Sequence, residues 1–201
     1  GHRMTELVNQ LVALSRMDEE GQPLNITEVS FGELAAMAAN AEPLRCFIDT
    51  DDARFGVPGN IPKRIAEYCR ETGQKVPETK GEIVRCVMES LALKYRQAIE
   101  GLEEIVGYKI PALHIVGGGC KEKTLCSFAA SAINRPVYAG PVEATSIGNL
   151  ATQLIGIGEL SSVDQAREMV RASFPIVEYT PVNPADWDAA YEKLLKLQKK
   201  I

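Results

Sequence analysis

Histidine is scarce in this chain: His2 and His114 are the only two among 201 residues. The five cysteines include no C-x-x-C pair, so the ligand sets and spacings of structural zinc sites are missing, and we assign no metal-binding residue. We expect the cysteines to be reduced thiols, as is usual in the cytoplasm. One alternative stays open, because Cys69 and Cys86 flank a short connection between two predicted helices, where a disulfide is geometrically possible. The five are Cys46, Cys69, Cys86, Cys120 and Cys126.

Long apolar runs and excess positive charge are also missing. No stretch approaches the ~20 apolar residues that cross a bilayer, and the first residues do not form a signal peptide. The formal net charge is −5, which argues against nucleic acid and anionic membranes as partners. Hydrophobic residues make up 45% and charged residues 24%, as in ordinary globular proteins. We therefore expect a cytoplasmic protein.

The most informative stretch lies in the second half of the chain. A strand is predicted over 113–116, followed by the glycines 117–119, a helix, a second strand over 136–139 and a further helix that starts near Glu143. This order is typical of α/β domains that bind a ligand at the carboxyl ends of their strands. Glycine lets the backbone approach a ligand closely, and the first amides of a helix attract anions. The stretch therefore predicts a nucleotide- or phosphate-binding turn.

The spacing of these glycines does not match the common nucleotide motifs. Glu122 stands where the dinucleotide fingerprint G-x-G-x-x-G has its last glycine, and no Gly-Lys-Ser/Thr of a P-loop occurs. A Rossmann-type oxidoreductase would carry an acidic residue about twenty positions beyond the glycines, where this chain has 138–140, Tyr-Ala-Gly. A tight strand-to-helix turn without a ligand remains the alternative.

Two capping boxes, Ser30-x-x-Glu33 and Thr79-x-x-Glu82, predict helices over about 31–40 and 80–106. The longer helix carries an apolar stripe that we expect to lie in the core. Its members are Ile83, Val87, Leu91, Tyr95, Ala98, Leu102 and Ile105.

Helices are also expected at 5–17, 62–73, 162–172 and from Pro184 onward, with a strand at 176–179 and a short strand or turn at 46–49. The chain has few predicted strands and many predicted helices, so we expect a small parallel sheet covered by helices. One or more strands of a complete sheet are then missing from this sequence.

Five motifs occur together in the chain: HIVGGG, RPVYAGPVEATSIGN, FIDTDDARFGVPGNIP, YCRETGQKVPET and GEIVRCVMESLALKYR. From about Phe47 to about Pro181 this combination resembles the C-terminal half of the FGGY carbohydrate kinases, and most of all their rhamnulokinase branch. The resemblance implies an α/β fold, an incomplete actin-like ATPase (ribonuclease H-like) C-terminal domain with a small sheet covered by many helices. Residues 1–4 look like a cloning remnant, and we expect 5–201 to be the nucleotide-binding domain, with the N-terminal sugar-binding domain absent.

The resemblance also implies ATP and Mg²⁺ as cofactors and transfer of the γ-phosphate to a ketose such as L-rhamnulose or a related deoxy-ketose. Relatives usually carry Asn in place of Glu122, and often Asn in place of Cys126 and Asp in place of Ser131. These differences indicate either an altered specificity or weaker nucleotide binding, and both remain open. The residues that match the nucleotide-binding positions are Gly117, Gly118, Gly119, Glu122, Glu143 and Thr145, with Gly148 and Asn149 in the turn that follows.

The family's catalytic base lies in a His-Asp-Thr-like segment, which neither His2-Arg3 nor His114-Ile115 matches. We assign no catalytic residue and expect the chain alone to be inactive, since the sugar would bind through the missing N-terminal domain. The alternative is a degenerate, non-catalytic nucleotide-binding or interaction module. Because the loss of a partner domain exposes apolar surface, we also expect self-association.

Overall fold

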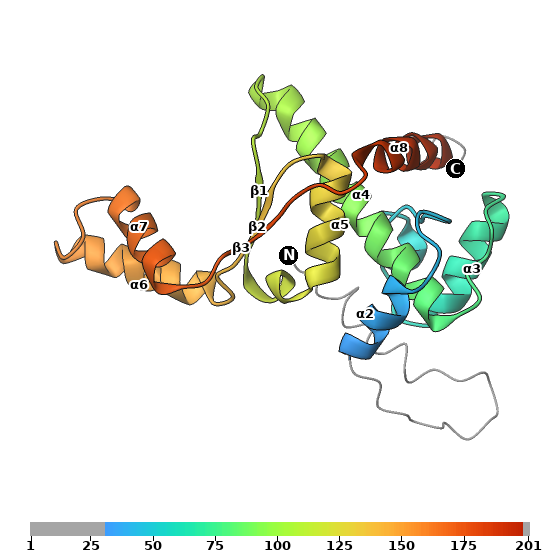
Figure 1. Cartoon of the computed structure of the whole chain (residues 1–201), viewed down its shortest axis with the longest axis horizontal. Coiled ribbons are helices and arrows are strands. Elements are labelled where there is room, and N and C mark those ends of the chain that lie inside the picture. The colour runs from blue at the N-terminus through green and yellow to red at the C-terminus, as the bar shows by residue number, and fades with distance from the viewer. Residues whose placement is uncertain (1–30, 199–201) are drawn as a thin grey trace. The chain divides into compact units, whose positions relative to one another are not determined.

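The computed structural model describes residues 31–198, so the predicted helix at 5–17 and the presumed cloning remnant 1–4 lie outside the described residues. The described part divides into two compact units, residues 31–94 with 185–198, and residues 95–184 (Figure 1). We describe each unit by itself. None of the described helices is both long and apolar enough to cross a membrane.

The first unit is built from helices. The predicted helices after residue 30 are present, and α3 begins with its Pro62 in the first turn, as expected from a proline near the start. The Asn60 side chain caps α3 by accepting from the Lys63 N–H. The elements of this unit are α2 (Phe31–Ala39), the 3-10 turn η2 (Ala53–Phe55), α3 (Ile61–Glu71), the first part of α4 (Lys80–Val106) and α8 (Pro184–Gln198).

The capping box that opens α4 is confirmed. The Glu82 N–H donates to Thr79 Oγ1 at 3.2 Å, and the Glu82 carboxylate accepts from the Thr79 N–H at 3.0 Å. The predicted apolar stripe is wrong at its far end, where Leu102 is 51% and Ile105 82% exposed. Ala98 is exposed as well, because the buried face there is formed by Ile99 and Glu103 instead.

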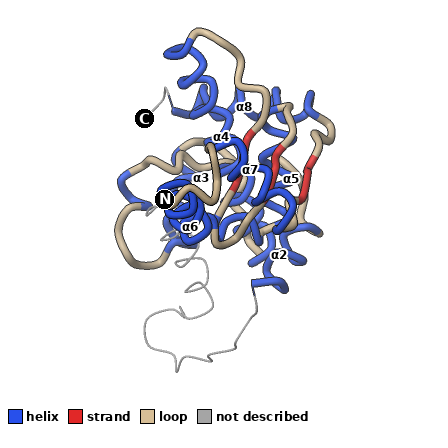
Figure 2. Tube along the Cα trace, turned by 90° about the vertical axis from the view of Figure 1, so that its left-hand side faces the viewer, coloured by secondary structure: helices blue, strands red, loops and turns tan. Residues whose placement is uncertain are grey.

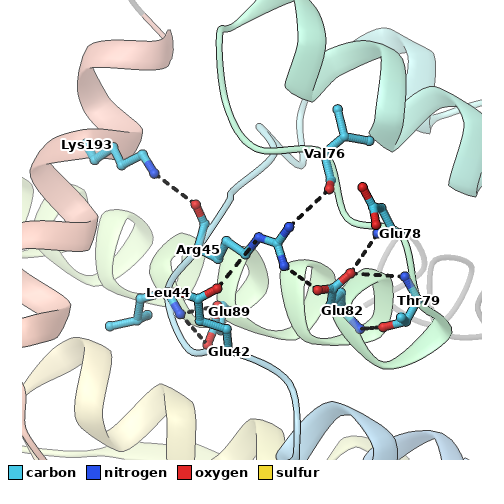
Figure 3. A network of polar contacts seen from close by, with 9 residues as sticks. All are labelled: Glu42, Leu44, Arg45, Val76, Glu78, Thr79, Glu82, Glu89 and Lys193. Carbon is cyan, nitrogen blue, oxygen red and sulfur yellow. Dashed lines mark hydrogen bonds and ion pairs between the residues drawn. The ribbon is translucent and has the colours of Figure 1, made fainter.

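Residues 46–49, where we expected a short strand or turn, have no regular structure. The segment 42–49 is held by polar contacts with helices (Figure 3). The Leu44 N–H donates to both carboxylate oxygens of Glu89 at 3.0 Å, and Glu89 itself is buried. The Arg45 guanidinium binds the carboxylate of Glu82, while Lys193 of α8 donates to the Arg45 carbonyl at 3.0 Å. These contacts satisfy backbone groups that no sheet pairs.

All five cysteines are free thiols, as expected for reduced side chains. The disulfide that the spacing of Cys69 and Cys86 allowed is therefore not formed. Both are buried, as is Cys46, and the three thiols influence one another's pKa values. The interactions of its thiol with those of Cys46 and Cys69, together with burial, raise the pKa of Cys86 well above its usual value.

The second unit holds the sheet, and Figure 2 shows its three short strands side by side. Strand β1 runs parallel to β2, with Ile115 paired to Ala139, but β3 runs antiparallel to β2. The expectation of a purely parallel sheet was wrong, because two successive helices return the chain to the end of the sheet from which it left. The elements are the rest of α4, β1 (Leu113–Ile115), the 3-10 turn η3 (Gly117–Lys121), α5 (Lys123–Ile133), β2 (Val137–Ala139), α6 (Ala144–Gly156), α7 (Val163–Ser173) and β3 (Val177–Tyr179).

One face of this sheet packs against α5 and α4. Ile115, Val137 and Ala139 from the strands form a buried cluster with Ile99 of α4 and with α5, whose small Ala129 and Ala130 allow close approach; Cys126 and Ile133 complete it. The opposite face carries a row of three paired residues, His114, Tyr138 and Glu178, with the first two rings 5.1 Å apart. The buried cluster therefore fixes the strand ends from which the site is built.

Candidate functional site

The glycine turn and the turn before α6 lie at one edge of the sheet, since β1 and β2 are parallel neighbours. The Gly140 N–H donates to the Ile115 carbonyl at 2.9 Å, which extends the pairing one residue beyond β2. The Gly117 N–H then donates to the Pro141 carbonyl at 3.1 Å. Two segments more than twenty residues apart are thereby joined at the carboxyl ends of the strands, where α/β folds bind ligands.

The three glycines have different surroundings. Gly117 has φ +74°, a conformation that side chains rarely adopt, and an added Cβ there would lie 3.9 Å from the Val142 carbonyl oxygen. Gly118 is exposed, and no heavy atom lies within 4 Å of an added Cβ. Gly119 faces the side chain of Ile115, 3.6 Å from an added Cβ. Gly118 is thus the position at which a ligand can lie directly against the backbone.

Glu122 is the residue immediately before α5, and its carboxylate accepts from the Thr124 N–H at 3.1 Å. This contact is a helix cap, which satisfies one of the free amides at the start of α5. The sequence placed Glu122 among the nucleotide-binding residues, and the structure gives it this structural contact in addition. An amide that is capped by a carboxylate does not attract a phosphate, so the anion-binding capacity of the α5 N-terminus is reduced.

Glu143 and Thr145 lie at the start of α6. Glu143 occupies the capping position without a side-chain cap bond, and both side chains are exposed. The hydrogen bond from the Gly117 N–H to the Pro141 carbonyl brings the glycine turn next to the segment that precedes Glu143. The structure therefore brings the glycines and the beginning of α6 together, while Thr145 lies further along the first turn of the helix.

The two other positions that differ from the family pattern lie on α5 and have contacts of their own. The buried Cys126 thiol donates weakly to the Gly119 carbonyl, with Sγ 3.9 Å from the oxygen, and burial raises its pKa to about 11. Ser131 Oγ donates to the Ser127 carbonyl at 2.9 Å and accepts from the Val182 N–H at 3.1 Å. Cys126 therefore contacts the glycine turn, whereas Ser131 connects α5 to the segment after β3, and the sequence predicted neither contact.

The sequence also did not predict a cleft of about 890 Å³ between the strand ends and α6 and α7. Of the eight residues matched to nucleotide-binding positions, only Gly148 lines it. Its walls include His114, Val116, Ile155 and Arg171. A signal was present in the apolar residues of α6, Ala151 and Ile155, which are four positions apart on one helix face.

The site has no metal-binding cluster: within residues 31–198, no group of three or more His, Cys, Asp or Glu side chains is placed to hold a metal ion. The open backbone at Gly118 fits the approach of a nucleotide, and Lys121 and Lys123 add exposed positive charge to the turn. The carboxylates of Glu122 and Glu143 oppose a phosphate at close range. The arrangement can present open backbone to a ligand at Gly118, with lysines nearby that attract a phosphate and carboxylates that repel it.

Two solved structures with this fold are sugar kinases. The xylulose kinase from Rhodospirillum rubrum matches with a TM-score of 0.64 at 20% sequence identity, covering 98% of this chain and 38% of that protein. The Plasmodium falciparum glycerol kinase, solved with ADP, matches with a TM-score of 0.56 at 17% identity, covering 85% of this chain and 33% of that protein. The fold is that of the C-terminal domain of an actin-like sugar kinase.

Sequence comparison gives the family. Residues 3–157 match the family model described as "FGGY family of carbohydrate kinases, C-terminal domain", and the chain belongs to this family. It is 46% identical over 168 residues to the rhamnulokinase of Bacteroides thetaiotaomicron, covering 84% of this chain and 35% of that protein. The rhamnulokinase of Bacillus subtilis is 44% identical over 154 residues, covering 77% of this chain and 32% of that protein. The chain thus spans about a third of the length of the curated relatives it matches.

Proposed function

We propose that this chain is the ATP-binding C-terminal part of a rhamnulokinase-like carbohydrate kinase, which phosphorylates a ketose such as L-rhamnulose in the cytoplasm. The observation that carries the proposal is the bond from the Gly117 N–H to the Pro141 carbonyl, 3.1 Å long. It joins the glycine turn to the segment that opens α6, next to the exposed backbone of Gly118. The identity of 46% to a rhamnulokinase supports the choice of sugar kinase.

In the proposed complex, ATP supplies the γ-phosphoryl group, and this chain binds and orients the nucleotide. Gly117, Gly118 and Gly119 present backbone to it, and the free amides at the start of α6 favour its negative charge. Glu122, Glu143 and Thr145 lie around the same turn, where a carboxylate oxygen can accept from a nucleoside N–H group. We assign Mg²⁺ to the nucleotide phosphates and to the part of the kinase that this chain does not span, since the described residues offer no metal cluster.

We propose further that the chain alone transfers no phosphate. A kinase must deprotonate the sugar hydroxyl and exclude water from the reacting groups. The 201 residues contain no His-Asp-Thr-like segment to supply the base. An assay that couples ADP formation to NADH oxidation, with L-rhamnulose or L-fuculose as acceptor, should show no rate above the rate without sugar. A sugar-dependent rate that is retained after rigorous purification would contradict this proposal.

A second candidate function is a non-catalytic nucleotide-binding or interaction module. The observation that favours it is the capping contact of Glu122 with the Thr124 N–H, at a position where the family pattern has Asn. If this chain does not bind nucleotide, the carboxylate of Glu122 repels no phosphate, and its role is to cap α5. A direct measurement of nucleotide binding distinguishes the two functions.

The test is a calorimetric titration of the chain with ADP and with ATP, each with and without Mg²⁺. We expect saturable binding that Gly118→Asp weakens by at least about tenfold, corresponding to about 1.4 kcal/mol. Gly101→Asp is the matched control, because Gly101 on α4 also has no heavy atom within 4 Å of an added Cβ. Absence of binding at millimolar nucleotide, or equal weakening by both substitutions, would contradict a site at the glycine turn.

A further inference from the structure

The two carboxylate oxygens of Glu122 have different surroundings. Oε1 accepts from the Thr124 N–H at 3.1 Å, which fixes the carboxylate at the start of α5. Oε2 has no hydrogen-bond or ion-pair partner among residues 31–198. The side chain is half-buried and follows the glycine turn by three residues. One oxygen in a fixed position is therefore available to a ligand that binds at this turn.

The chemistry of that oxygen distinguishes between the purine bases. A carboxylate only accepts hydrogen bonds, so it requires donors from the base. Guanine has two adjacent donors, its N1–H and its N2 amino group. Adenine has one donor, the N6 amino group, and this group lies between the acceptors N1 and N7, which a carboxylate oxygen repels. The free oxygen of Glu122 is therefore better matched to guanine than to adenine.

We propose that Glu122 enables the nucleotide site of this chain to bind guanine nucleotides at least as tightly as adenine nucleotides, by accepting from the N1–H and the N2 amino group of guanine. This inference rests on the proposed function, because it requires a nucleotide at the glycine turn. It adds the class of base that the site selects and the residue that selects it.

The charges around the turn favour a base, not a phosphate, at Glu122. Glu122 is half-buried whereas Glu143 is exposed, so solvent screens the repulsion between Glu122 and a phosphate less. Lys121 and Lys123 flank Glu122, but both are exposed, and their attraction for a phosphate is screened more. The start of α6 has no side-chain cap, so its amides can bind phosphate. The base of a bound nucleotide therefore lies toward α5 and its phosphates toward α6.

The Thr124 N–H determines which atom of residue 122 is left for the ligand. In Glu122→Gln this N–H binds the amide oxygen, the one acceptor of the new side chain, and the amide NH₂ group takes the place of Oε2. The NH₂ group donates to the acceptors of adenine and opposes the two donors of guanine. The substitution therefore reverses the preference for the base while the cap of α5 is kept.

The first test is a calorimetric titration of the whole chain with GDP and with ADP. Both ligands carry the same diphosphate, so the ratio of their Kd values reports the base alone. We expect GDP to bind the unchanged chain at least as tightly as ADP, and Glu122→Gln to shift the ratio toward ADP by about tenfold. Glu143→Gln is the matched control. It removes the same charge beside the same turn but has no cap bond, so it should change both affinities alike and leave the ratio unchanged.

A second measurement uses the unchanged chain and covers the case in which Glu122→Gln does not fold. IDP keeps the N1–H of guanine and lacks the N2 amino group, so we expect it to bind at least about fivefold more weakly than GDP. Equal binding of GDP and IDP, weaker binding of GDP than of ADP, or an unchanged ratio in folded Glu122→Gln overturns this inference and leaves the proposed function standing. If neither GDP nor ADP binds at millimolar concentration, the proposed function fails and this inference fails with it.

Discussion

The carboxylate of Glu103, near the end of α4, binds the guanidinium of Arg135, which lies just after α5. Lys109 and the Ile110 N–H donate to the same carboxylate at 2.7 and 2.8 Å. Only 6% of Glu103 is exposed. One buried acid therefore holds the end of α4, the approach to β1 and the approach to β2 in register.

This arrangement predicts a pH dependence of stability. The hydrogen bond from Arg135, then that from Lys109, lower the pKa of Glu103 to about 2, from an ordinary value of 4.5. For an acid whose folded-state pKa is lowered, the stabilisation is present above pH 4.5 and is lost as the pH falls toward 2. Urea unfolding between pH 7 and 2 should show this loss. Glu103→Gln should be less stable at pH 7 and flatter below pH 4.5, and an identical slope in both proteins would refute the assignment.

Glu89 and Glu100 of α4 offer a comparison between a buried and an exposed ion pair of the same spacing. Arg85 donates to Glu89 at 2.7 Å and Arg96 to Glu100 at 2.9 Å, but the acidic side chains are 1% and 38% exposed. Glu89→Ala removes the acceptor of the Leu44 N–H and one partner of a buried pair, so we expect about 3–5 kcal/mol of lost stability. Glu100→Ala should cost at most about 0.5 kcal/mol. If chemical denaturation gave similar losses of stability for the two variants, burial would not decide how much such an ion pair contributes.

Sequence patterns predicted those elements whose signals are local. Thr79 and Glu82 satisfy each other's amides within four residues, so the start of α4 was predicted at the right residue. The strand, glycine turn and helix around Gly117 were likewise predicted, because glycine and apolar runs mark such boundaries directly.

The rest depends on contacts between distant segments. Ile105 is exposed because the buried face of α4 there carries Glu103, which binds Arg135. Arg135 lies 32 residues further along the chain, so the apolar periodicity of α4 does not reveal this contact. The capping role of Glu122 competes with the ligand role that the resemblance implies, and the sequence alone does not distinguish them. The cleft near His114 arises from the packing of α6 and α7, beyond any single motif.

The hydroxyl of Ser131 predicts a measurable loss on substitution. It accepts from the Val182 N–H and donates to the Ser127 carbonyl, and it is 3% exposed. Ser131→Ala leaves the Val182 N–H without this acceptor, so we expect a loss of about 1–2 kcal/mol in thermal or chemical unfolding. Ser127→Ala is the control, since the Ser127 contact with Ser131 uses its backbone carbonyl. If both variants unfold alike, the hydroxyl does not secure residue 182.

Glu122 is the position at which helix capping and ligand binding can be separated. Glu122→Ala removes the acceptor of the Thr124 N–H and should destabilise the chain by about 0.5–2 kcal/mol. Glu122→Asn retains a capping oxygen and removes a negative charge, so stability should be kept while ADP binds more tightly than to the unchanged chain. Unfolding curves and calorimetric titrations of the three proteins provide both quantities. Weaker ADP binding by Glu122→Asn at unchanged stability would mean that the carboxylate itself accepts from the nucleotide. Unchanged ADP binding across all three would place the nucleotide away from this residue.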